Sequence, residues 1–501
     1  MTYCRALAVV AVVGFLLMIL GGAGVLFVPK LFVSIVLKKL PLVNGSEAFE
    51  LWRDIPLPAF QKVYFFNLTN PYEFLQEGKK PKLQEVGPYT FRVSMVKTNI
   101  VWNPNHTVSY REVRTFHFDR EKSVGGQDDV IVSINALLVG AGALLKRANP
   151  ALRLVMAVVI NKLNEQLIVN HTVGELLYDG YPDFLAAASH MLDPTIPTSD
   201  GKFGYMHGRN ATDDGLYTVY TGEDRMDLYN VITRWNGKEN LTAWKGTCNM
   251  INGTNGELEP PLKPGQDTLE LFNSDICRSF KLVREGTDSL YGISAVRFRV
   301  DNRTFDNGTT YPPNACFDTK RTMASGAVDI GPCQHNLPAA LSFPHFYLAD
   351  PSYSDKVEGM KPDPDRHSFT LDMEPRLGLS LKINARIQTN FILERDPLIR
   401  NLRNIPELTY PILWQDLAVE LDQKFADHLK SLMDRPLYYS LLFSYLLLGF
   451  GAIMVLAVAA FVAGRALQRF LSPGDDDSSL LINDDDKVDE PSDKENGIIH
   501  G

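Results

Sequence analysis

Apolar residues are concentrated in two long runs near the ends of the chain. Ala6 to Val28 and Leu437 to Ala463 contain no charged residue over 23 and 27 positions, respectively. About 20 apolar residues suffice for a helix to cross the hydrocarbon core of a bilayer. The pattern therefore predicts two transmembrane helices, at 6–28 and 437–463, that separate a short N-terminus (1–5), a central region (29–436) and a tail (464–501).

The central region is dominated by short segments in which apolar and polar residues alternate. Alternation with a period of two, rich in Val, Tyr, Phe and Thr and interrupted by turn residues, is typical of antiparallel β-structure. The segments are KVYFF (62–66), YTFRVSMV (89–96), TVSYREVRTFHF (107–118), GLYTVYTG (215–222), ISAVRFRV (293–300), SFTLDM (368–373) and LSLKINARIQTNFIL (379–393). No internal repeat or long linker divides the region, which has room for one large domain or two smaller ones.

Helical patterns concentrate between residues 130 and 188. We expect helices at 134–145 and 151–168, separated by Asn149-Pro150, because proline is tolerated in the first turn of a helix and not in its interior. Positions 154–160 are all apolar, so that stretch of helix has no polar side. Two interpretations stay open: a small bundle that buries its own core, or a bundle that also presents an apolar face to a lipid or protein ligand. Together with the strands, this predicts an α+β fold.

Nine N-x-S/T sequons fall between the two apolar runs and none falls outside them. Because glycosylation takes place in the lumen, we expect the central region to be lumenal or extracellular and both termini to be cytosolic. The sequons are at Asn44, Asn67, Asn105, Asn170, Asn210, Asn240, Asn252, Asn302 and Asn307.

Most of the net charge of −9 belongs to the tail. Residues 472–501 hold ten acidic residues against Lys487 and Lys494, which is −8, so the central region is close to neutral. A tail of this composition is too polar to form a packed core. The central region has no cluster of Lys and Arg of the kind that a nucleic-acid partner needs.

Four of the five cysteines lie in the expected lumenal region. Cys248, Cys277, Cys316 and Cys333 predict two disulfides, for which three pairings are available. Cys4 lies at the cytosolic edge of the first apolar run, where it is a candidate for palmitoylation or an idle thiol.

Catalytic and cofactor motifs are not found. The sequence lacks G-x-S-x-G, H-E-x-x-H, C-x-x-C and the phosphate-binding loop, and its ten histidines are scattered singly without metal-ligand spacing. We therefore predict no catalytic residue, no metal site and no cofactor, and a protein that is not an enzyme.

Particular strings identify the chain as resembling the class B scavenger receptors, a family that includes the fatty-acid translocase, the high-density-lipoprotein receptor and lysosomal integral membrane protein type two. They follow one another through nearly the whole central region: EVGPYTFR (85–92), TVGELL (172–177), YTGED (220–224), CNMINGT (248–254), SDICRS (274–279), SFPHFYLAD (342–350), VEGMKPDPDRHSFTLDMEP (357–375) and PILW (411–414). The resemblance implies a large antiparallel β-barrel-like ectodomain, a helical bundle at its membrane-distal apex, and an internal apolar tunnel toward the bilayer.

The resemblance also implies a function. A scavenger receptor of this kind binds lipids, lipoproteins or a protein ligand at the apex and passes fatty acid, sterol or carotenoid through the tunnel. The apex helices then make Leu154, Val155, Val158, Val159 and Lys162 the candidate ligand-binding residues. The alternative that the family offers is a lysosomal or endosomal membrane protein that exports lipid or escorts a lumenal hydrolase.

Some positions depart from the family pattern. Lys162 matches the first of two apex lysines that bind anionic ligands in the fatty-acid translocase, but the second is Asn164 here. The pH-sensing apex histidine of the lysosomal relative has no counterpart between His117 and His171. The family's C-x-C motif is Cys316-Phe317-Asp318 here, so a third disulfide of the family cannot form. The remaining pairing that the resemblance implies is Cys248 with Cys316 and Cys277 with Cys333.

The tail carries a candidate sorting signal. Asp476 precedes the pair Leu480-Leu481 by four residues, which is the acidic dileucine pattern that clathrin adaptors bind. Two interpretations stay open. The motif is a sorting signal for endosomes, or the two leucines occur by chance in an acidic tail and have no role in sorting. The expected location is the plasma membrane, the endosome–lysosome membrane, or both, and the sequence leaves a homo-oligomer open.

Overall fold

The computed structural model describes residues 2–192, 196, 198, 200–319 and 321–471. They divide into two compact units, one made by the described parts of Met1–Leu31 and Pro436–Gly501 and the other by Phe32–Arg435. The first unit contains most of the two apolar helices, and the second is the ectodomain.

Two long apolar helices make up the first unit and run into the second. They are α1 (Thr2–Leu37) and α9 (Gln423–Leu471), both long and apolar enough to cross a membrane. Both extend past the ends of the predicted spans. Within the unit they touch at glycines: a side chain at Gly21 would collide with the backbone of Ser444 and Leu448. Glycine permits this close approach between membrane helices.

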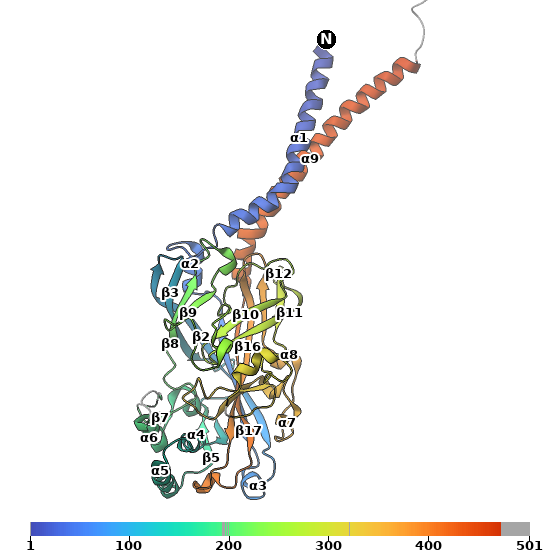
Figure 1. Ribbon diagram of the computed structural model, residues 1–501. Coiled ribbons are helices and arrows are strands. Elements are labelled where there is room, and N and C mark those ends of the chain that lie inside the picture. Colours follow the sequence, from blue (N-terminus) through green and yellow to red (C-terminus); the bar gives the residue numbers. More distant parts are fainter. Residues whose placement is uncertain (1, 193–195, 197, 199, 320, 472–501) are drawn as a thin grey trace, which may run out of the picture. The chain divides into compact units, whose positions relative to one another are not determined.

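Seventeen strands and seven further α-helices form the described ectodomain (Figure 1). The strands are β1 (Ala59–Leu68), β2 (Leu83–Asn103), β3 (Thr107–Phe118), β4 (Val130–Ile134), β5 (Ile168–Thr172), β6 (Tyr181–Pro182), β7 (Lys202–Phe203), β8 (Thr212–Tyr220), β9 (Ile232–Trp235), β10 (Thr268–Asn273), β11 (Arg278–Leu290), β12 (Ile293–Arg299), β13 (Ala327–Asp329), β14 (Ala339–Ser342), β15 (Thr370–Glu374), β16 (Leu379–Leu393) and β17 (Leu408–Glu420). The α-helices are α2 (Glu47–Arg53), α3 (Pro71–Gln76), α4 (Ala136–Leu145), α5 (Pro150–Leu163), α6 (Phe184–Leu192), α7 (Pro351–Ser354) and α8 (Pro364–His367). Shorter helical turns are η1 (Glu175–Asp179), η2 (Met226–Leu228), η3 (Gly246–Asn249), η4 (Pro312–Phe317), η5 (Pro344–Phe346) and η6 (Arg400–Leu402).

Thirteen strands form one antiparallel sheet. Eleven follow the order β10-β11-β12-β15-β16-β17-β1-β2-β3-β8-β9, and β14 joins β13 to β16. Each alternating segment of the sequence overlaps one of these strands, although 215–222, 293–300 and 368–373 extend one or two residues beyond β8, β12 and β15. β3 and β16 have the predicted bounds.

A two-residue segment nearly closes the sheet into a barrel. Ile232 N–H of the edge strand β9 donates to Gly253 O at 2.9 Å, and Phe272 N–H of the other edge strand, β10, donates to Thr254 O at 2.8 Å. Gly253 has φ 84°, and a side chain there would collide with the backbone of Glu270. Glycine at 253 thus lets the segment lie against β10, and few backbone groups at the two edges stay unpaired.

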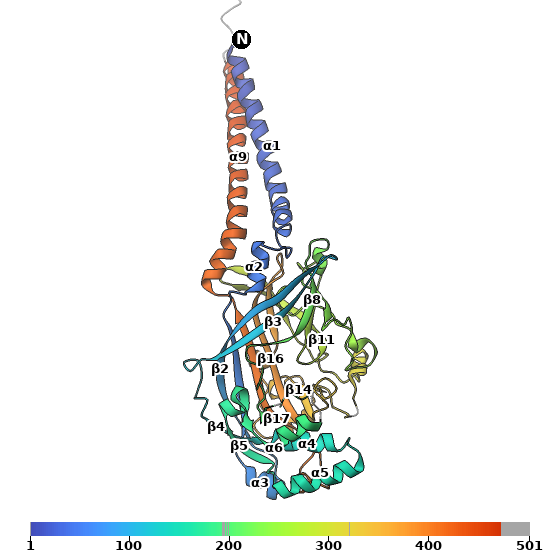
Figure 2. The ribbon, with the colours of Figure 1, turned by 90° about the vertical axis from the view of Figure 1, so that its left-hand side faces the viewer.

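The helices α4, α5 and α6 gather at one end of the ectodomain, and α2 lies at the other (Figures 1 and 2). We call α4–α6 the helical end. Part of the stretch predicted as helical is extended instead, since β4 and β5 pair with each other and flank α4 and α5. The predicted helix 151–168 ends at Leu163, because Asn164 adopts the left-handed conformation (φ 52°, ψ 38°) that stops a helix.

Candidate functional site

Helix α5 buries one face and exposes the other. Ala157 and Ile160 are each 2% exposed, whereas Leu154, Val155 and Val158 are 57%, 60% and 48% exposed. We call these three exposed residues the apolar stripe. Large apolar side chains grouped on one exposed face mark an interaction site more often than scattered ones do. Both interpretations of this segment therefore hold in part: the bundle has its own core and also presents an apolar face.

Local sequence fixes where α5 begins and where its side chains point. Asn149 caps the helix by accepting a hydrogen bond from Leu152 N–H at 2.9 Å, and Pro150 occupies the first turn. Leu154 and Val158 are four residues apart, so they lie on the same side of the helix. Val159 is half-buried and belongs to the edge of the stripe.

A distant segment holds α5 in place. Arg153 Nη2 lies 3.1 Å from the buried carboxylate of Asp396. Asn161 uses both ends of its amide: Nδ2 donates to Leu398 O at 2.8 Å, and Oδ1 accepts from Arg400 N–H at 2.8 Å. The stripe is therefore presented by a helix with a fixed position, which reduces the entropy lost when a ligand binds.

Lys162 follows Val158 by one turn and is exposed. Lys146, on the loop before α5, pairs with Glu394 at 2.8 Å, whereas Lys162 forms no ion pair with any described residue. A lone cation beside an apolar stripe suits an amphipathic ligand with a negative group. Asn164 at the end of the helix adds no charge.

A shallow, open hollow lies beside the last turn of α5. Its lining is Ile160, Asn161, Asn164, Glu165, Ile399, Arg400 and Asn401. Pockets for drug-sized ligands measure about 300–1,000 Å³. The hollow beside α5 encloses no volume of this size, so it does not by itself form a pocket for a lipid.

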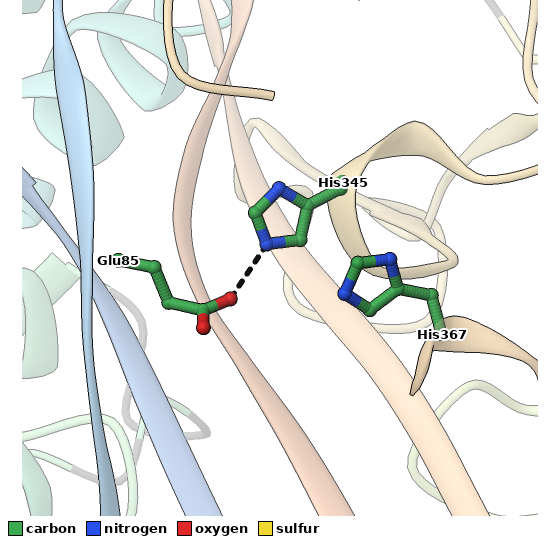
Figure 3. Close-up of side chains that lie close together, drawn as sticks. All are labelled: Glu85, His345 and His367. Carbon is green, nitrogen blue, oxygen red and sulfur yellow. Dashed lines mark hydrogen bonds and ion pairs between the residues drawn. The ribbon is translucent and has the colours of Figure 1, made fainter. Parts of the chain in front are cut away.

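A polar cluster formed by Glu85, His345 and His367 lies within the ectodomain, away from the apolar stripe. Figure 3 shows Glu85 of β2 facing His345 of η5, with His367 of α8 stacked on His345 at 4.4 Å between ring centroids. Glu85 accepts from His345 Nε2 at 2.6 Å, from Trp414 Nε1 at 2.9 Å and from Arg366 Nη2 at 3.0 Å. Burial alone would raise the pKa of Glu85, but these three donors outweigh it and lower the pKa to about 2.

The three side chains hold their ligand atoms within 4.8 Å of one another, which suggests a metal site. The hydrogen bonds argue against one. Lys361 N–H donates to Nδ1 of His345 at 3.1 Å, and Asp363 N–H donates to Nδ1 of His367 at 2.9 Å. Each ring must then carry its proton on Nε2, the atom that faces the cluster, where a metal requires a free lone pair. The cluster instead fastens η5 and α8 to β2 and β17.

This cluster was not predicted from the sequence, because its members are far apart in the chain and the histidines have no regular spacing. One signal was present. Glu85, His345 and His367 all fall in strings that carried the family resemblance, EVGPYTFR, SFPHFYLAD and VEGMKPDPDRHSFTLDMEP.

A buried ionic cluster lies near α2, inside the ectodomain. Lys97 is fully buried, with Nζ 2.8 Å from Glu257 and 3.1 Å from Glu112. Its ammonium also lies 5.2 Å from the ring centroid of Trp52 and 5.6 Å from that of Tyr110. Burial and the neighbouring charge of Glu112 raise the pKa of Glu257 to about 7, whereas Lys97 stays charged. Arg114 Nε also lies 2.9 Å from Glu112, so two cations balance the carboxylate of Glu112 and the easily protonated carboxyl of Glu257.

Glu259 predicts a pH dependence of stability. It is 2% exposed, its carboxyl bonds to Thr254 at the barrel closure, and burial raises its pKa from 4.5 to about 8. Above pH 4.5 the folded chain keeps this proton, whereas the unfolded chain releases it. The contribution of Glu259 to stability is therefore largest in acid and falls as the pH rises toward 8. The loss is about 1.4 kcal/mol per pH unit in that window.

We expect Glu259→Gln to remove this dependence and to raise the free energy of unfolding at neutral pH by on the order of 2 kcal/mol. Tryptophan fluorescence in denaturant, measured at pH 5 and pH 7.4 on the full chain, tests the expectation. The surface variant Glu239→Gln, at a half-exposed ion pair with Arg234, should leave the slope as it is. Equal pH slopes for Glu259→Gln and the parent chain would contradict the assignment.

None of the nine sequon asparagines is buried. Six are exposed and three are half-buried in the described structure. The half-buried ones are Asn67, Asn252 and Asn307. Every sequon thus remains a prediction, and the amide nitrogen of Asn307 donates to Met323 O at 3.0 Å.

The structure joins Cys248 to Cys316 and Cys277 to Cys333, with Cα–Cα distances of 5.8 and 6.1 Å. This is the pairing that the resemblance implies. Cys4 is free and exposed on α1. The sorting residues Asp476, Leu480 and Leu481 lie outside the described residues.

Comparison with known proteins places these features in a family. The family model that matches residues 12–462 is described as the CD36 family. Scavenger receptor class B member 1 of Bos taurus is 34% identical over 459 residues, which is 90% of this chain and 88% of that protein. The Sus scrofa protein of the same name is 35% identical over 453 residues, covering 89% and 87%. Lysosome membrane protein 2 of Homo sapiens is 34% identical over 403 residues, covering 80% and 83%.

Both kinds of relative align with most of the ectodomain, and the family model also covers most of each apolar helix. The β-barrel-like sheet, the helical end and the two terminal membrane helices are therefore features of one family fold. This chain belongs to the CD36 family.

Proposed function

We propose that this protein is a scavenger receptor that binds lipid or lipoprotein ligands at its helical end and passes lipid to the membrane. The observation that carries the proposal is the apolar stripe of Leu154, Val155 and Val158, exposed on a helix that the segment 396–400 holds in place. Relatives named as scavenger receptors support it.

The proposed route for lipid is an apolar tunnel through the barrel-like body. Each methylene that leaves water contributes about 0.8 kcal/mol, so a 16-carbon chain resists transfer through water by roughly 12 kcal/mol. A shielded path removes this barrier and needs no energy source, because lipid then moves down its gradient. Fatty acid, sterol and carotenoid are the cargoes that this route would take. No cofactor or catalytic residue is part of the proposal.

Cells that express the full chain provide the test. Uptake of a non-hydrolysable labelled sterol ester from lipoprotein, and of labelled fatty acid from albumin, should exceed uptake by matched cells without the protein. Uptake without degradation of the lipoprotein's protein would indicate selective transfer rather than engulfment. The proposal fails if neither lipid enters faster than in the matched cells.

The second candidate is an endosomal or lysosomal membrane protein that exports lipid or escorts a lumenal hydrolase. Relatives named lysosome membrane protein 2 and the motif Asp476-x-x-x-Leu480-Leu481 favour it. Clathrin adaptors are the partners that this motif would engage. Both candidates place the ectodomain in the lumen or outside the cell.

We expect Leu480→Ala combined with Leu481→Ala to raise the fraction of protein at the cell surface several-fold, because the adaptor slot needs the paired leucines. Surface biotinylation against total protein measures it. Ile498→Ala with Ile499→Ala is the matched control, since that pair lies in the same tail and has Lys494, not an acid, four residues before it. An unchanged surface fraction in the leucine variant would remove this motif from sorting.

A further inference from the structure

Arg278, the first residue of β11, has a buried guanidinium. The residue is 2% exposed and follows Cys277 of the second disulfide. Its Nη2 donates to Thr304 O at 2.5 Å. The guanidinium carbon lies 3.7 Å from the ring centroid of Phe317 and 5.6 Å from that of Phe305.

This charge has no partner of opposite sign among the described residues, since no carboxylate there forms an ion pair with Arg278. The acids nearest to Thr304 along the chain are committed elsewhere. Asp301 pairs with Arg303, and Asp306 accepts from backbone N–H groups of the following turn. The usual means of neutralising a buried arginine is therefore missing.

Two polar atoms here, one in the guanidinium itself and one in Thr304, also lack partners. Nε of Arg278 and Oγ1 of Thr304 are buried without a hydrogen bond to any described residue. Thr304 itself is 5% exposed. Both atoms can donate, and the hydroxyl can rotate to suit an acceptor. Unpaired donors gathered around one buried positive charge are what an anion requires.

The two aromatic faces and one carbonyl do not balance the charge. Cation–π contacts and a carbonyl bond recover only part of the solvation that a buried ion loses. Burial lowers the pKa of Arg278 to about 9, which still leaves it protonated in blood plasma and in acidic endosomes. The cation therefore persists, and a counter-ion must come from solution.

We propose that Arg278 Nε and Thr304 Oγ1 bind a small monovalent anion of the halide class. The enclosure sets the size limit: Arg278, Thr304 and Phe305 are all at most 5% exposed, so a fatty acid or phospholipid headgroup has no room. The ion would tie the start of β11 to the 304–317 segment. Cys316, which the first disulfide joins to Cys248, precedes Phe317, so ion and disulfide fasten the same part of the fold. The site is separate from the helical end and does not depend on the proposed lipid function.

Thermal unfolding of the full glycosylated chain in detergent tests the site. Sodium chloride and sodium bromide should raise the midpoint temperature in a saturable way relative to sodium gluconate at equal ionic strength, since gluconate is too large to enter. Bromide should also give an anomalous scattering peak beside Arg278 in crystals. Equal midpoints in chloride and gluconate would overturn the proposal, and so would a halide effect without a peak at this position.

Variants assign any halide effect to these two residues. Thr304→Val keeps the charge and removes one donor, so it should shift the halide response to higher concentration by several-fold. Arg278→Met should abolish the response. Arg297→Gln is the control, because Arg297 already has Asp372 as its partner at 2.7 Å, and its response should equal that of the parent chain. If Arg278→Met does not fold, an unaltered response in Thr304→Val by itself overturns the site.

Discussion

Replacement of Val155 and Val158 together by aspartate is expected to reduce lipid uptake by about ten-fold or more at equal surface expression. Two carboxylates on the apolar stripe would have to lose water when a lipid or lipoprotein surface covers them, and about 1.4 kcal/mol of lost binding already gives a ten-fold effect. Folding should be little affected, because both side chains are roughly half exposed or more and aspartate in a helix costs about 0.7 kcal/mol or less.

A matched control comes from two valines that are exposed to the same degree elsewhere. Val101 and Val124 are 57% and 58% exposed and lie outside the helical end. Val101→Asp with Val124→Asp adds the same charge to the same ectodomain, so it separates a local effect from one of net charge. Uptake is measured per surface molecule, counted with an antibody to an added epitope. Equal uptake by the stripe variant and the control would exclude the stripe from lipid capture.

The strands could be predicted because their alternation is a local property. The segment 107–118 alternates at both of its ends and lies in β3 with the same bounds. The end of α5 could not be predicted in this way, since Asn164, Glu165 and Gln166 are all tolerated in a helix and only the left-handed backbone of Asn164 stops it. The predicted helix 134–145 begins two residues early, because Ile134 ends strand β4 and Asn135 caps α4; a short apolar segment such as VIVSI is compatible with either structure.

The candidate site, like the fold, could be predicted from the sequence only in part. The uniformly apolar run 154–160 indicated a helix without a polar face, and the structure adds which of its residues face solvent. The clamp between Asn161 and the segment 398–400 could not be foreseen, because contacts between segments more than two hundred residues apart leave no local pattern. Buried charges such as Lys97 could not be predicted either, because an isolated lysine in a strand is expected to face solvent.

The buried carboxyls bear on where the protein works. Glu257 and Glu259 lie in the segment that follows the barrel closure, and burial raises the pKa of both, to about 7 and about 8. Acidification therefore favours the folded state through these two groups. These two contributions to stability are larger at endosomal and lysosomal pH than at neutral pH, which suits both a surface receptor that is internalised and a resident lysosomal protein.

Replacement of Lys97 by methionine is expected to be the most destabilising single change outside the disulfides. Lys97 is the cation within 3.1 Å of both Glu112 and Glu257, and its loss leaves Glu112 with Arg114 alone and Glu257 without a cation among the described residues. Removing one partner from a buried ionic cluster destabilises by about 3–5 kcal/mol. For about 400 residues, at roughly 2.1 cal/mol/K of unfolding entropy per residue, this lowers the midpoint of thermal unfolding by about 5 °C.

The pH dependence distinguishes this loss of charge balance from a simple packing defect. Without Lys97 the pKa of Glu257 rises further, so the deficit should be smaller at pH 5, where that carboxyl is protonated, than at pH 7.4. Adding Glu257→Gln to Lys97→Met should restore most of the stability at pH 7.4. Lys82→Met is the control, since Lys82 and Glu358 are half exposed and 3.8 Å apart, a pair that contributes at most about 1 kcal/mol. A deficit that is independent of pH, or a double variant no more stable than Lys97→Met, would show that the methionine side chain and not the missing charge causes the loss.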